Sequence, residues 1–327
     1  MQYNVSSMSV EHQPRICIAG AGAVGTLLCG VFGNKYEKTM TVIAHDRRAE
    51  SFQKNGIILN SDFYGRRTVH PMKICEKLHK NEIQDYIFVC VKNYSINNIA
   101  ETFKAGIGAD TVIVPVMNGV DPGKELRGIF PDVIVADSLI YTVTSSEKDF
   151  SARQLGKYTY MFVGSMINEP EFQNGARRLY ETIKASGFDV RWSDDIESEI
   201  WQKYILNCAF NTITARYLTT SGIIRKNSSM KSDLKELLEE GFNVGKAEGV
   251  NLPENLVDIK YSFMTEKQSE DATSSMKRDI EAGNRTELEA FLGTLVKKAK
   301  ADKINVPAAE RYYKEIKEIE KRNTTIK

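Results

Sequence analysis

A glycine-rich turn near the N-terminus constrains the fold more than any other feature of this chain. The turn follows a short apolar run at 15–20 and opens a segment of helical spacing. It fits the pattern G-x-G-x-x-G through Gly20, Ala21, Gly22, Ala23, Val24 and Gly25. In this setting the first glycine permits a tight turn, the second lets the backbone approach a pyrophosphate, and the third lets helix and strand pack closely. The turn therefore predicts a dinucleotide site at a helix N-terminus.

Compact, β-branched runs recur through the first two thirds of the chain. Helical or polar segments separate these runs, which lie at residues 15–20, 41–44, 86–91, 111–116, 133–138, 158–165 and 188–193. Strands that are apolar on both sides are typical of a parallel sheet covered on both faces. This part of the chain therefore predicts a mostly parallel, doubly covered sheet.

The pattern changes near residue 195, where strand candidates end. Helical periodicity then recurs in the segments 196–218, 234–250, 268–282 and 286–302. We therefore predict an α/β protein with an N-terminal Rossmann dinucleotide-binding domain and an all-helical C-terminal domain. The predicted divisions are a disordered tail over 1–14, the Rossmann domain over 15–194 and the helical domain over 195–327.

Composition restricts the partners and the compartment. The chain has 44 Lys and Arg against 43 Asp and Glu, and no basic block stands out, which argues against nucleic-acid and membrane-surface partners. No apolar run approaches the roughly 20 residues that span a bilayer. The five cysteines are scattered without a C-x-x-C pair, which favours the reducing cytoplasm. All four histidines precede residue 80, so we expect no metal site and no catalytic histidine in the second half.

The residues after the second apolar run decide how the adenosine ribose is recognised. An acidic group would bind a free 2′-hydroxyl, whereas an arginine would pair with a 2′-phosphate. The sequence offers both, as Asp46, Arg47 and Arg48. It therefore leaves the choice between NADP and NAD open.

Lys92 and Asn118 follow two later strands and are expected at the same ligand-binding edge of the sheet.

A polar stripe marks the first helix of the helical domain. Lys203, Asn207 and Asn211 are spaced four apart and so share one face of a helix that is apolar on most other faces. Buried polar groups need partners, because an unpaired amide costs about 2–7 kcal/mol. Either a polar ligand or a hydrogen-bond network between helices would supply those partners.

A second polar cluster lies in the segment SSMKRDIEAGNRTELEAF. Ser275 belongs to a helix that is expected to end near Gly283. Thr286 is then expected to cap the next helix, with Glu289 completing a capping box and Glu287 in the first turn. Taken alone, Ser275 and Glu287 are more typical of ordinary polar surface residues than of a binding site.

Four motifs together resemble one enzyme family. GAGAVG, VMNG, EIWQKYILNCAFNTITA and SSMKRDIEAGNRTELEAFLG occur in this order, and the resemblance runs from about residue 15 to about 315. They are similar to the ketopantoate reductase (2-dehydropantoate 2-reductase) family. The resemblance implies a cleft between a Rossmann domain and a helical domain. It also implies reduction of 2-dehydropantoate to pantoate with NADPH, a step in pantothenate and coenzyme A synthesis.

The resemblance also implies roles for individual residues. Lys203 matches the family's general acid and Glu287 the carboxylate that works with it. The positions that hold substrate or nicotinamide match Asn118, Asn207, Asn211 and Ser275, and a cofactor contact matches Lys92.

Two positions depart from the family pattern. Ser221-Gly222 stands where the family has an Asn-Gly pair that contacts substrate, and Ser221 is accordingly expected to bind substrate less strongly. The family's 2′-phosphate arginine falls on His45, with Arg47 and Arg48 slightly displaced.

The expected chemistry is hydride addition to a ketone carbon while Lys203 stabilises and protonates the oxygen. Two other functions stay open. One is a related reductase of another 2-oxo or 3-hydroxy acid, and the other is a non-catalytic dinucleotide-binding module. The partner is expected to be a small oxo acid, and a homodimer is one option for the assembly.

Overall fold

A six-stranded parallel sheet organises the N-terminal half of the chain. In the computed structural model, which describes residues 13–325, its strands lie in the order β5–β2–β1–β6–β7–β8. Their bounds are β1 (Ile16–Ala19), β2 (Met40–Ile43), β5 (Lys73–Cys75), β6 (Tyr86–Val89), β7 (Val112–Pro115) and β8 (Ile134–Val135). All neighbouring pairs are parallel. Counted along the chain, this is the doubly wound order 3-2-1-4-5-6, which confirms the predicted Rossmann domain.

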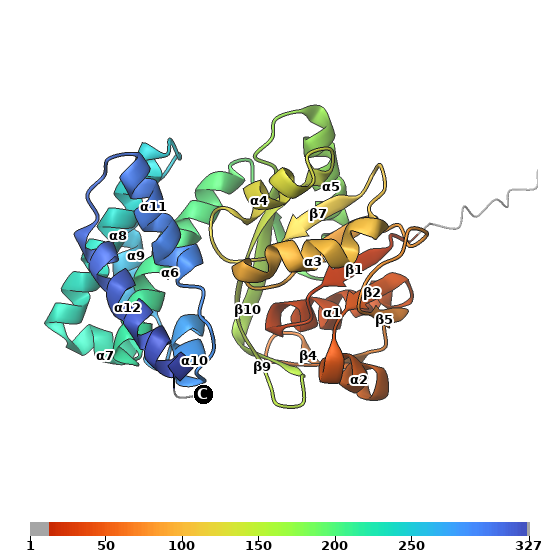
Figure 1. The fold of residues 1–327 in the computed structure, drawn as a ribbon, viewed down its shortest axis with the longest axis horizontal. Coiled ribbons are helices and arrows are strands. Elements are labelled where there is room, and N and C mark those ends of the chain that lie inside the picture. The colour runs from red at the N-terminus through yellow and green to blue at the C-terminus, as the bar shows by residue number, and fades with distance from the viewer. Residues whose placement is uncertain (1–12, 326–327) are drawn as a thin grey trace, which may run out of the picture.

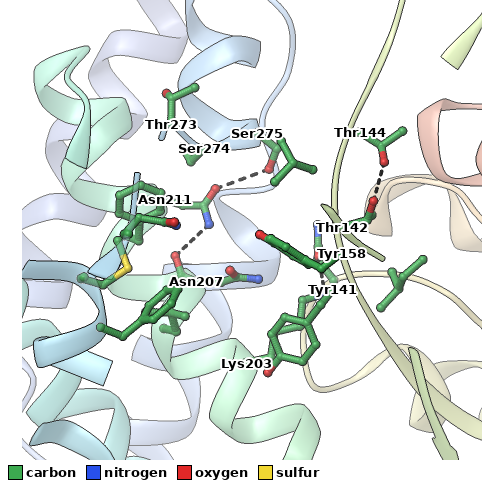
Figure 2. Close-up of a pocket in the computed structure, with 18 of the residues that line it drawn as sticks. Tyr141, Thr142, Thr144, Tyr158, Lys203, Asn207, Asn211, Thr273, Ser274 and Ser275 are labelled. Atoms are coloured by element: carbon green, nitrogen blue, oxygen red, sulfur yellow. Dashed lines mark hydrogen bonds between the residues drawn. The ribbon is translucent and has the colours of Figure 1, made fainter. Parts of the chain in front are cut away.

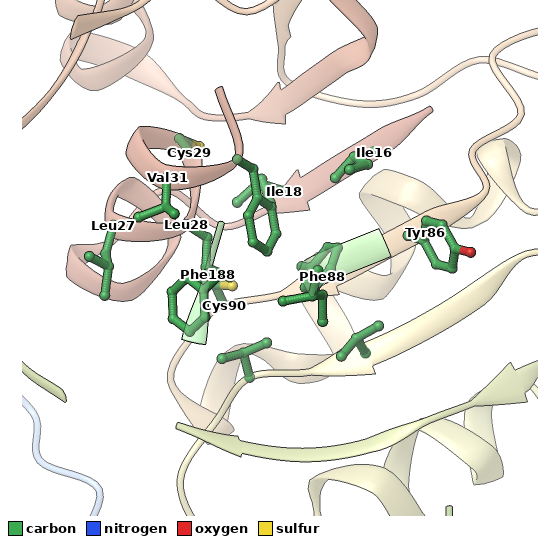
Figure 3. Close-up of a cluster of buried hydrophobic side chains, with 14 of the residues drawn as sticks. Ile16, Ile18, Leu27, Leu28, Cys29, Val31, Tyr86, Phe88, Cys90 and Phe188 are labelled. Atoms are coloured by element: carbon green, nitrogen blue, oxygen red, sulfur yellow. The ribbon is translucent and has the colours of Figure 1, made fainter. Parts of the chain in front are cut away.

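Helices cover both faces of this sheet. They are α1 (Ala23–Tyr36), α2 (Asp46–Asn55), α3 (Ile96–Phe103), α4 (Pro122–Ile129) and α5 (Pro170–Ala185). Because side chains alternate along a strand, Ile16 and Ile18 pack with α1 and α5, whereas Cys17 and Ala19 pack with α3 and α4. Figure 3 shows Leu28 of α1 gathered with Ile18 of β1 and Phe88 of β6 in one core. This two-sided core holds the glycine turn rigidly between β1 and α1.

A second sheet is mixed, which corrects the prediction for this region. Its strands are β3 (Ile57–Ser61), β4 (Gly65–Val69), β9 (Asp137–Ser146), β10 (Ala152–Gly164) and β11 (Asp189–Trp192). β3 pairs with β4, and β9 with β10, in antiparallel register. The long β9–β10 hairpin lies between the parallel sheet and the helical part of the molecule (Figure 1).

The C-terminal part is helical, as predicted. Its helices are α6 (Ile196–Tyr217), α7 (Ser221–Lys226), α8 (Ser228–Ala247), α9 (Leu256–Ser262), α10 (Ser275–Glu281), α11 (Thr294–Ala301) and α12 (Pro307–Thr325). π-helical turns occupy Phe263–Lys267 and Glu289–Gly293. A separate apolar core surrounds α6. None of the described helices is long and apolar enough to cross a membrane.

Two local predictions for this part need correction. Helix was expected over 268–282, but only Ser275–Glu281 is helical, and the preceding residues form a loop. Thr286 does cap the next turn, since its hydroxyl accepts a hydrogen bond from the Leu288 amide at 3.1 Å. Glu289 does not complete a capping box, because its carboxylate accepts from Tyr313 and Lys317 on α12 instead.

The expected division at 194/195 falls in the turn between β11 and α6, where Asp195 caps α6 by accepting from the Ser198 amide. The tail expected over 1–14 lies outside the described residues, apart from its last two.

Candidate active site

The polar stripe of α6 lies in the wall of a cavity between the two parts of the chain. Lys203, Asn207 and Asn211 all line this cavity, whose volume is about 560 Å³. Figure 2 shows Asn207 and Asn211 along α6, with Tyr141 and Tyr158 of the β9–β10 hairpin on the opposite side. Helical spacing therefore gave the right face of the helix, and the hairpin closes the site from across.

Asn118 connects Lys203 to the N-terminal domain. It lies in the turn after β7, where Gly119 takes a positive φ of 94°. Lys203 Nζ donates to Asn118 Oδ1 at 3.3 Å, and Asn118 Nδ2 donates to Glu287 Oε2 at 3.2 Å. These two contacts fix which end of the amide faces the lysine. Asn118 thus bridges Lys203 and Glu287, and among the described contacts no direct ion pair joins them.

Glu287 is the centre of a network between the domains. Its carboxylate is only 4% exposed. It accepts hydrogen bonds from Lys92 Nζ at 3.2 Å, from the Asn93 amide at 3.2 Å and from Asn93 Nδ2 at 2.9 Å, in addition to Asn118. These donors, one of them charged, satisfy the hydrogen-bonding capacity of the buried carboxylate.

Lys92 contacts the helical domain as well as the cofactor side. Its Nζ also lies 3.0 Å from Asp279 of α10. Burial acts against its charge, but Glu287 and Asp279 outweigh burial, so the pKa of Lys92 lies above its ordinary value. The sequence placed Lys92 at the ligand-binding edge of the sheet and missed this role in joining the domains.

Lys203 is the most strongly perturbed amine of the site. Burial lowers the pKa of Lys203 to about 8, and the charge of Glu287 opposes that shift. Its Nζ also lies 5.8 Å from the centroid of the Tyr141 ring. A group with a pKa near the working pH can both hold and release a proton, as a general acid must.

The last residue of the stripe has a partly structural role. Asn211 Nδ2 donates to the Asn207 carbonyl at 3.0 Å, and Asn211 Oδ1 accepts from Ser275 Oγ at 3.4 Å and from the Met276 amide at 3.4 Å (Figure 2). The alternative of a network between helices therefore holds for Asn211. By contrast, the amide side chain of Asn207 makes no hydrogen bond to another described residue and faces the cavity.

A second cavity of about 720 Å³ lies at the carboxyl ends of the parallel strands. The glycine turn, the end of β2 and the end of β6 line it through Gly20, Ala21, Gly22, Ala23, Val24, Ala44, His45, Arg48, Cys90 and Lys92. This is the switch point of the strand order, between β1 and β6, where ligands bind in sheets of this kind.

The geometry of the glycine turn suits a phosphate group. A Cβ on Gly22 would point into open space, with the Cys90 carbonyl oxygen 4.0 Å away as its nearest neighbour. A Cβ on Gly25 would instead collide with the Gly20 carbonyl oxygen. Gly22 is also the N-cap of α1 and provides no side-chain cap, so the first amides of α1 are left for a ligand. The turn therefore fits the pyrophosphate of a dinucleotide.

The three ribose candidates occupy different environments. Arg48 lines the cavity, donates to the Ala21 carbonyl and lies 5.2 Å from the centroid of the Phe150 ring. Burial lowers the pKa of Arg48. Asp46 and Arg47 are exposed, and neither is among the residues that line this second cavity. Of the three, the structure brings only Arg48 to the cofactor cavity.

The two cavities meet, and five residues line both: Val24, Asn118, Ile140, Thr144 and Ser275. A hydride donor in one cavity can therefore reach a substrate in the other close to Asn118 and Lys203.

Within residues 13–325, no cluster of His, Cys, Asp or Glu is suited to hold a metal ion.

Ser221, for which a substrate contact was expected, does not line either cavity but contacts Met264, which lines the first. It is 1% exposed, and its hydroxyl donates to the Met264 carbonyl at 3.2 Å.

Two residues of the network around Glu287 were not predicted from the sequence. Asn93 and Asp279 both contact Glu287 or Lys92. Asn93 follows a parallel strand directly after Lys92, so the argument used for Lys92 could have found it.

Fold and site together define a class: a Rossmann domain joined to a helical domain, with joined cavities at the boundary. Residues 16–168 match the family described as ketopantoate reductase PanE/ApbA, and residues 195–320 match its C-terminal domain. The chain belongs to this ketopantoate reductase family of oxidoreductases.

Two curated relatives span nearly the whole chain. An uncharacterized oxidoreductase, YkpB, of Bacillus subtilis is 27% identical over 301 residues, which cover 91% of this chain and 96% of that protein. The 2-dehydropantoate 2-reductase of Archaeoglobus fulgidus is 27% identical over 284 residues, covering 87% of this chain and 90% of the relative.

Solved structures agree with the fold. A PanE/ApbA family ketopantoate reductase from Ralstonia eutropha superposes with a TM-score of 0.84 at 23% identity, covering 94% of this chain and 99% of the other. D-mandelate dehydrogenase, in a ternary structure with NADH and anilino(oxo)acetate, also gives 0.84, at 18% identity and the same coverage. A dimeric ketopantoate reductase from Staphylococcus aureus gives 0.76 at 19% identity, again with 94% and 99% coverage.

Proposed function

We propose that this chain reduces a 2-oxo acid to the 2-hydroxy acid with a reduced nicotinamide dinucleotide. The first candidate substrate is 2-dehydropantoate and the first candidate cofactor is NADPH, with Lys203 as the general acid. The single observation that carries the proposal is the position of Lys203: an amine whose pKa burial lowers to about 8 lines the substrate cavity and donates to Asn118, which lines both cavities. Family membership supports the same reaction type.

In this proposal the glycine turn and Lys92 would hold the dinucleotide, and Arg48 would face a 2′-phosphate. When bound, the cofactor would supply the hydride to the carbonyl carbon. NADH remains the alternative. Arg48 is a single arginine whose guanidinium already donates to the Ala21 carbonyl, so it would bind a 2′-phosphate less strongly than two free arginines would.

Lys203 would act on the carbonyl oxygen. Its ammonium stabilises the negative charge that develops there and then delivers the proton held on Nζ. Asn118 Oδ1 aims the ammonium. Glu287 orients Asn118 by accepting from Nδ2 and raises the pKa of Lys203 through its charge, so that Glu287 is a positioning residue.

The substrate would be oriented by Asn207 and Ser275, with Asn211 holding Ser275 in place. The lining of the substrate cavity contains Lys203, Lys260 and Arg278 and, among the described residues, no Asp or Glu. A cationic wall of this kind favours an anionic substrate such as an oxo acid.

A reductase of a different 2-oxo acid is the second candidate. It is favoured by the burial of Ser221 outside the lining of the cavity and by the structural likeness to D-mandelate dehydrogenase. If the substrate is 2-dehydropantoate, the reaction belongs to pantothenate and coenzyme A synthesis. The cytoplasm stays the expected compartment, and a homodimer stays a proposal that the dimeric relative supports.

The test follows oxidation of NADPH and NADH at 340 nm with 2-dehydropantoate and a panel of other 2-oxo acids. The proposal predicts turnover with at least one 2-oxo acid and product identified as the 2-hydroxy acid. Binding of the cofactor without turnover on any oxo acid would instead identify a non-catalytic dinucleotide-binding module.

A further inference from the structure

We infer that the preferred substrates are 2-oxo acids whose side group is apolar and larger than the hydroxyl-bearing group of 2-dehydropantoate. The inference rests on the proposed reduction of 2-oxo acids and concerns only what the substrate cavity selects beyond the reacting carbonyl.

Helix α6 presents two parallel stripes to the cavity. Asn207 and Asn211 form the polar stripe with Lys203, and Leu206 and Phe210, also four apart, form an apolar stripe beside it. The polar stripe can hold the carboxylate and the carbonyl. A substituent on the next carbon would then extend over the apolar stripe.

The apolar stripe continues onto the end of α9. Ile259 and Phe263 lie one helical turn apart, line the same cavity and are followed by Met264. These side chains and those of Leu206 and Phe210 all come from the helical part of the molecule and line the same cavity, and they are called the apolar wall below.

The opposite wall is aromatic. Tyr141, Tyr158 and Tyr160 of the β9–β10 hairpin line the cavity, with ring centroids 5.1 Å apart for Tyr141 and Tyr160 and 6.4 Å for Tyr158 and Tyr160. Aromatic rings bind apolar and aromatic groups in stacked or edge-to-face contact. A flat or branched apolar group would fit between these rings and the helical wall.

Exposure of apolar side chains is concentrated at this cavity. Of twelve large hydrophobic side chains that are exposed in the described chain, four line it: Val143, Tyr158, Ile259 and Phe263. Ile259 is 50% exposed and Phe263 37%. When a ligand covers apolar groups that are exposed to water around a cavity, the free energy of the complex is lowered.

The size of the cavity agrees with a larger side group. The dinucleotide has a cavity of about 720 Å³, so most of the separate 560 Å³ is left for the substrate. Clefts of roughly 300–1,000 Å³ enclose drug-sized ligands. Since a short oxo acid would leave most of the apolar wall uncovered, the cavity suits a 2-oxo acid with an aromatic or long branched side group.

The test measures kcat/KM for pyruvate, 2-dehydropantoate, 6-methyl-2-oxoheptanoate and phenylpyruvate with saturating NADPH or NADH. Each fully buried methylene contributes about a fourfold gain. If about half of the six extra carbons of phenylpyruvate are buried, its kcat/KM is expected to exceed that of pyruvate by on the order of 100-fold and that of 2-dehydropantoate by about tenfold or more. A kcat/KM for 2-dehydropantoate equal to or above those of both apolar acids would overturn the inference and leave the proposed function intact. No turnover with any 2-oxo acid would overturn both.

A variant series locates the selectivity. The double variant Ile259→Ala, Phe263→Ala is expected to lower kcat/KM for phenylpyruvate about tenfold more than for pyruvate. Ile223→Ala is the matched control, because Ile223 is 53% exposed and lies outside the cavity lining. If the double variant changes the oligomeric state measured by light scattering and affects all acids equally, the apolar wall is an interface between copies and the inference is wrong.

Discussion

The strongest consequence of the site geometry concerns the pH dependence of Glu287→Gln. In the reduction direction Lys203 must be protonated, so kcat/KM should be constant at low pH and fall above the Lys203 pKa of about 8. Glu287 opposes the effect of burial and so raises that pKa. Removing its charge must therefore move the alkaline limb to lower pH.

The magnitude follows from the two hydrogen bonds that separate the groups. Lys203 Nζ to Asn118 is 3.3 Å and Asn118 to Glu287 is 3.2 Å, which with the width of the amide group puts the charges roughly 9 Å apart at most. At an effective dielectric constant of about 20, that separation gives about 2 kcal/mol, and partial neutralisation of Glu287 by Lys92 reduces it to an effect on the order of one pH unit. The limb of the variant is expected near pH 7.

The assay is kcat/KM against pH, from about 5 to 10, with the best 2-oxo acid and either cofactor. Asp279→Asn is the matched control, because Asp279 also pairs with Lys92 but does not contact Asn118. Its limb is expected to stay near pH 8. The reasoning is refuted if the limb of Glu287→Gln stays where it is in the parent, moves to higher pH, or moves equally in Asp279→Asn.

Three further predictions concern the cofactor turn, the ribose and a buried hydroxyl. Gly22→Val should fold, because its Cβ points into open space, but it should lose the cofactor binding that fluorescence titration measures in the parent; an unchanged affinity would contradict the pyrophosphate assignment. Gly25→Ala should instead lose thermal stability, because its Cβ would collide with the Gly20 carbonyl oxygen. Arg48→Ala should raise the KM for NADPH more than for NADH, with exposed Arg47→Ala as control; equal effects of Arg48→Ala on both cofactors would remove its role. Ser221→Asn should lower the free energy of unfolding in urea by about 1–3 kcal/mol through overpacking, and a large change in substrate KM at unchanged stability would restore the expected contact.

The sequence predicted the frame of the fold because the frame depends on local signals. The fully buried parallel strands are compact apolar runs, and the glycine turn has one strand–turn–helix setting. The edge strand β5 (Lys73–Cys75) is only partly buried and was not predicted. The second sheet was less accessible. β4 (Gly65–Val69) is mostly exposed and carries two arginines, and β9 becomes polar towards its end at Ser146, so neither reads as a strand that must be buried.

The candidate site was predictable where residues share one element. Lys203, Asn207 and Asn211 lie on one helix, so their common face follows from spacing. The bridging role of Asn118 was not predictable, because it depends on how a strand-end turn meets Glu287 from the other domain. Tertiary contacts across 169 residues of sequence leave no local pattern.

Ser221 shows the limit of carrying a role over by position. Its neighbour in space, the Met264 carbonyl, lies in a π-helical turn that the sequence did not predict. The hydroxyl is therefore used to hold that turn beside the cavity. A residue two steps from the substrate can look like a ligand in the sequence and act as a support in the fold.

Lys203→Ala tests whether Lys203 supplies the proton. Loss of a general acid typically costs about 10²–10⁴-fold in turnover. We predict a fall of that size in kcat for the best 2-oxo acid, with the dissociation constant of the cofactor within a few fold of the parent, because the glycine turn lies in the other cavity. A kcat for Lys203→Ala within a few fold of the parent would contradict it and assign proton transfer to another group.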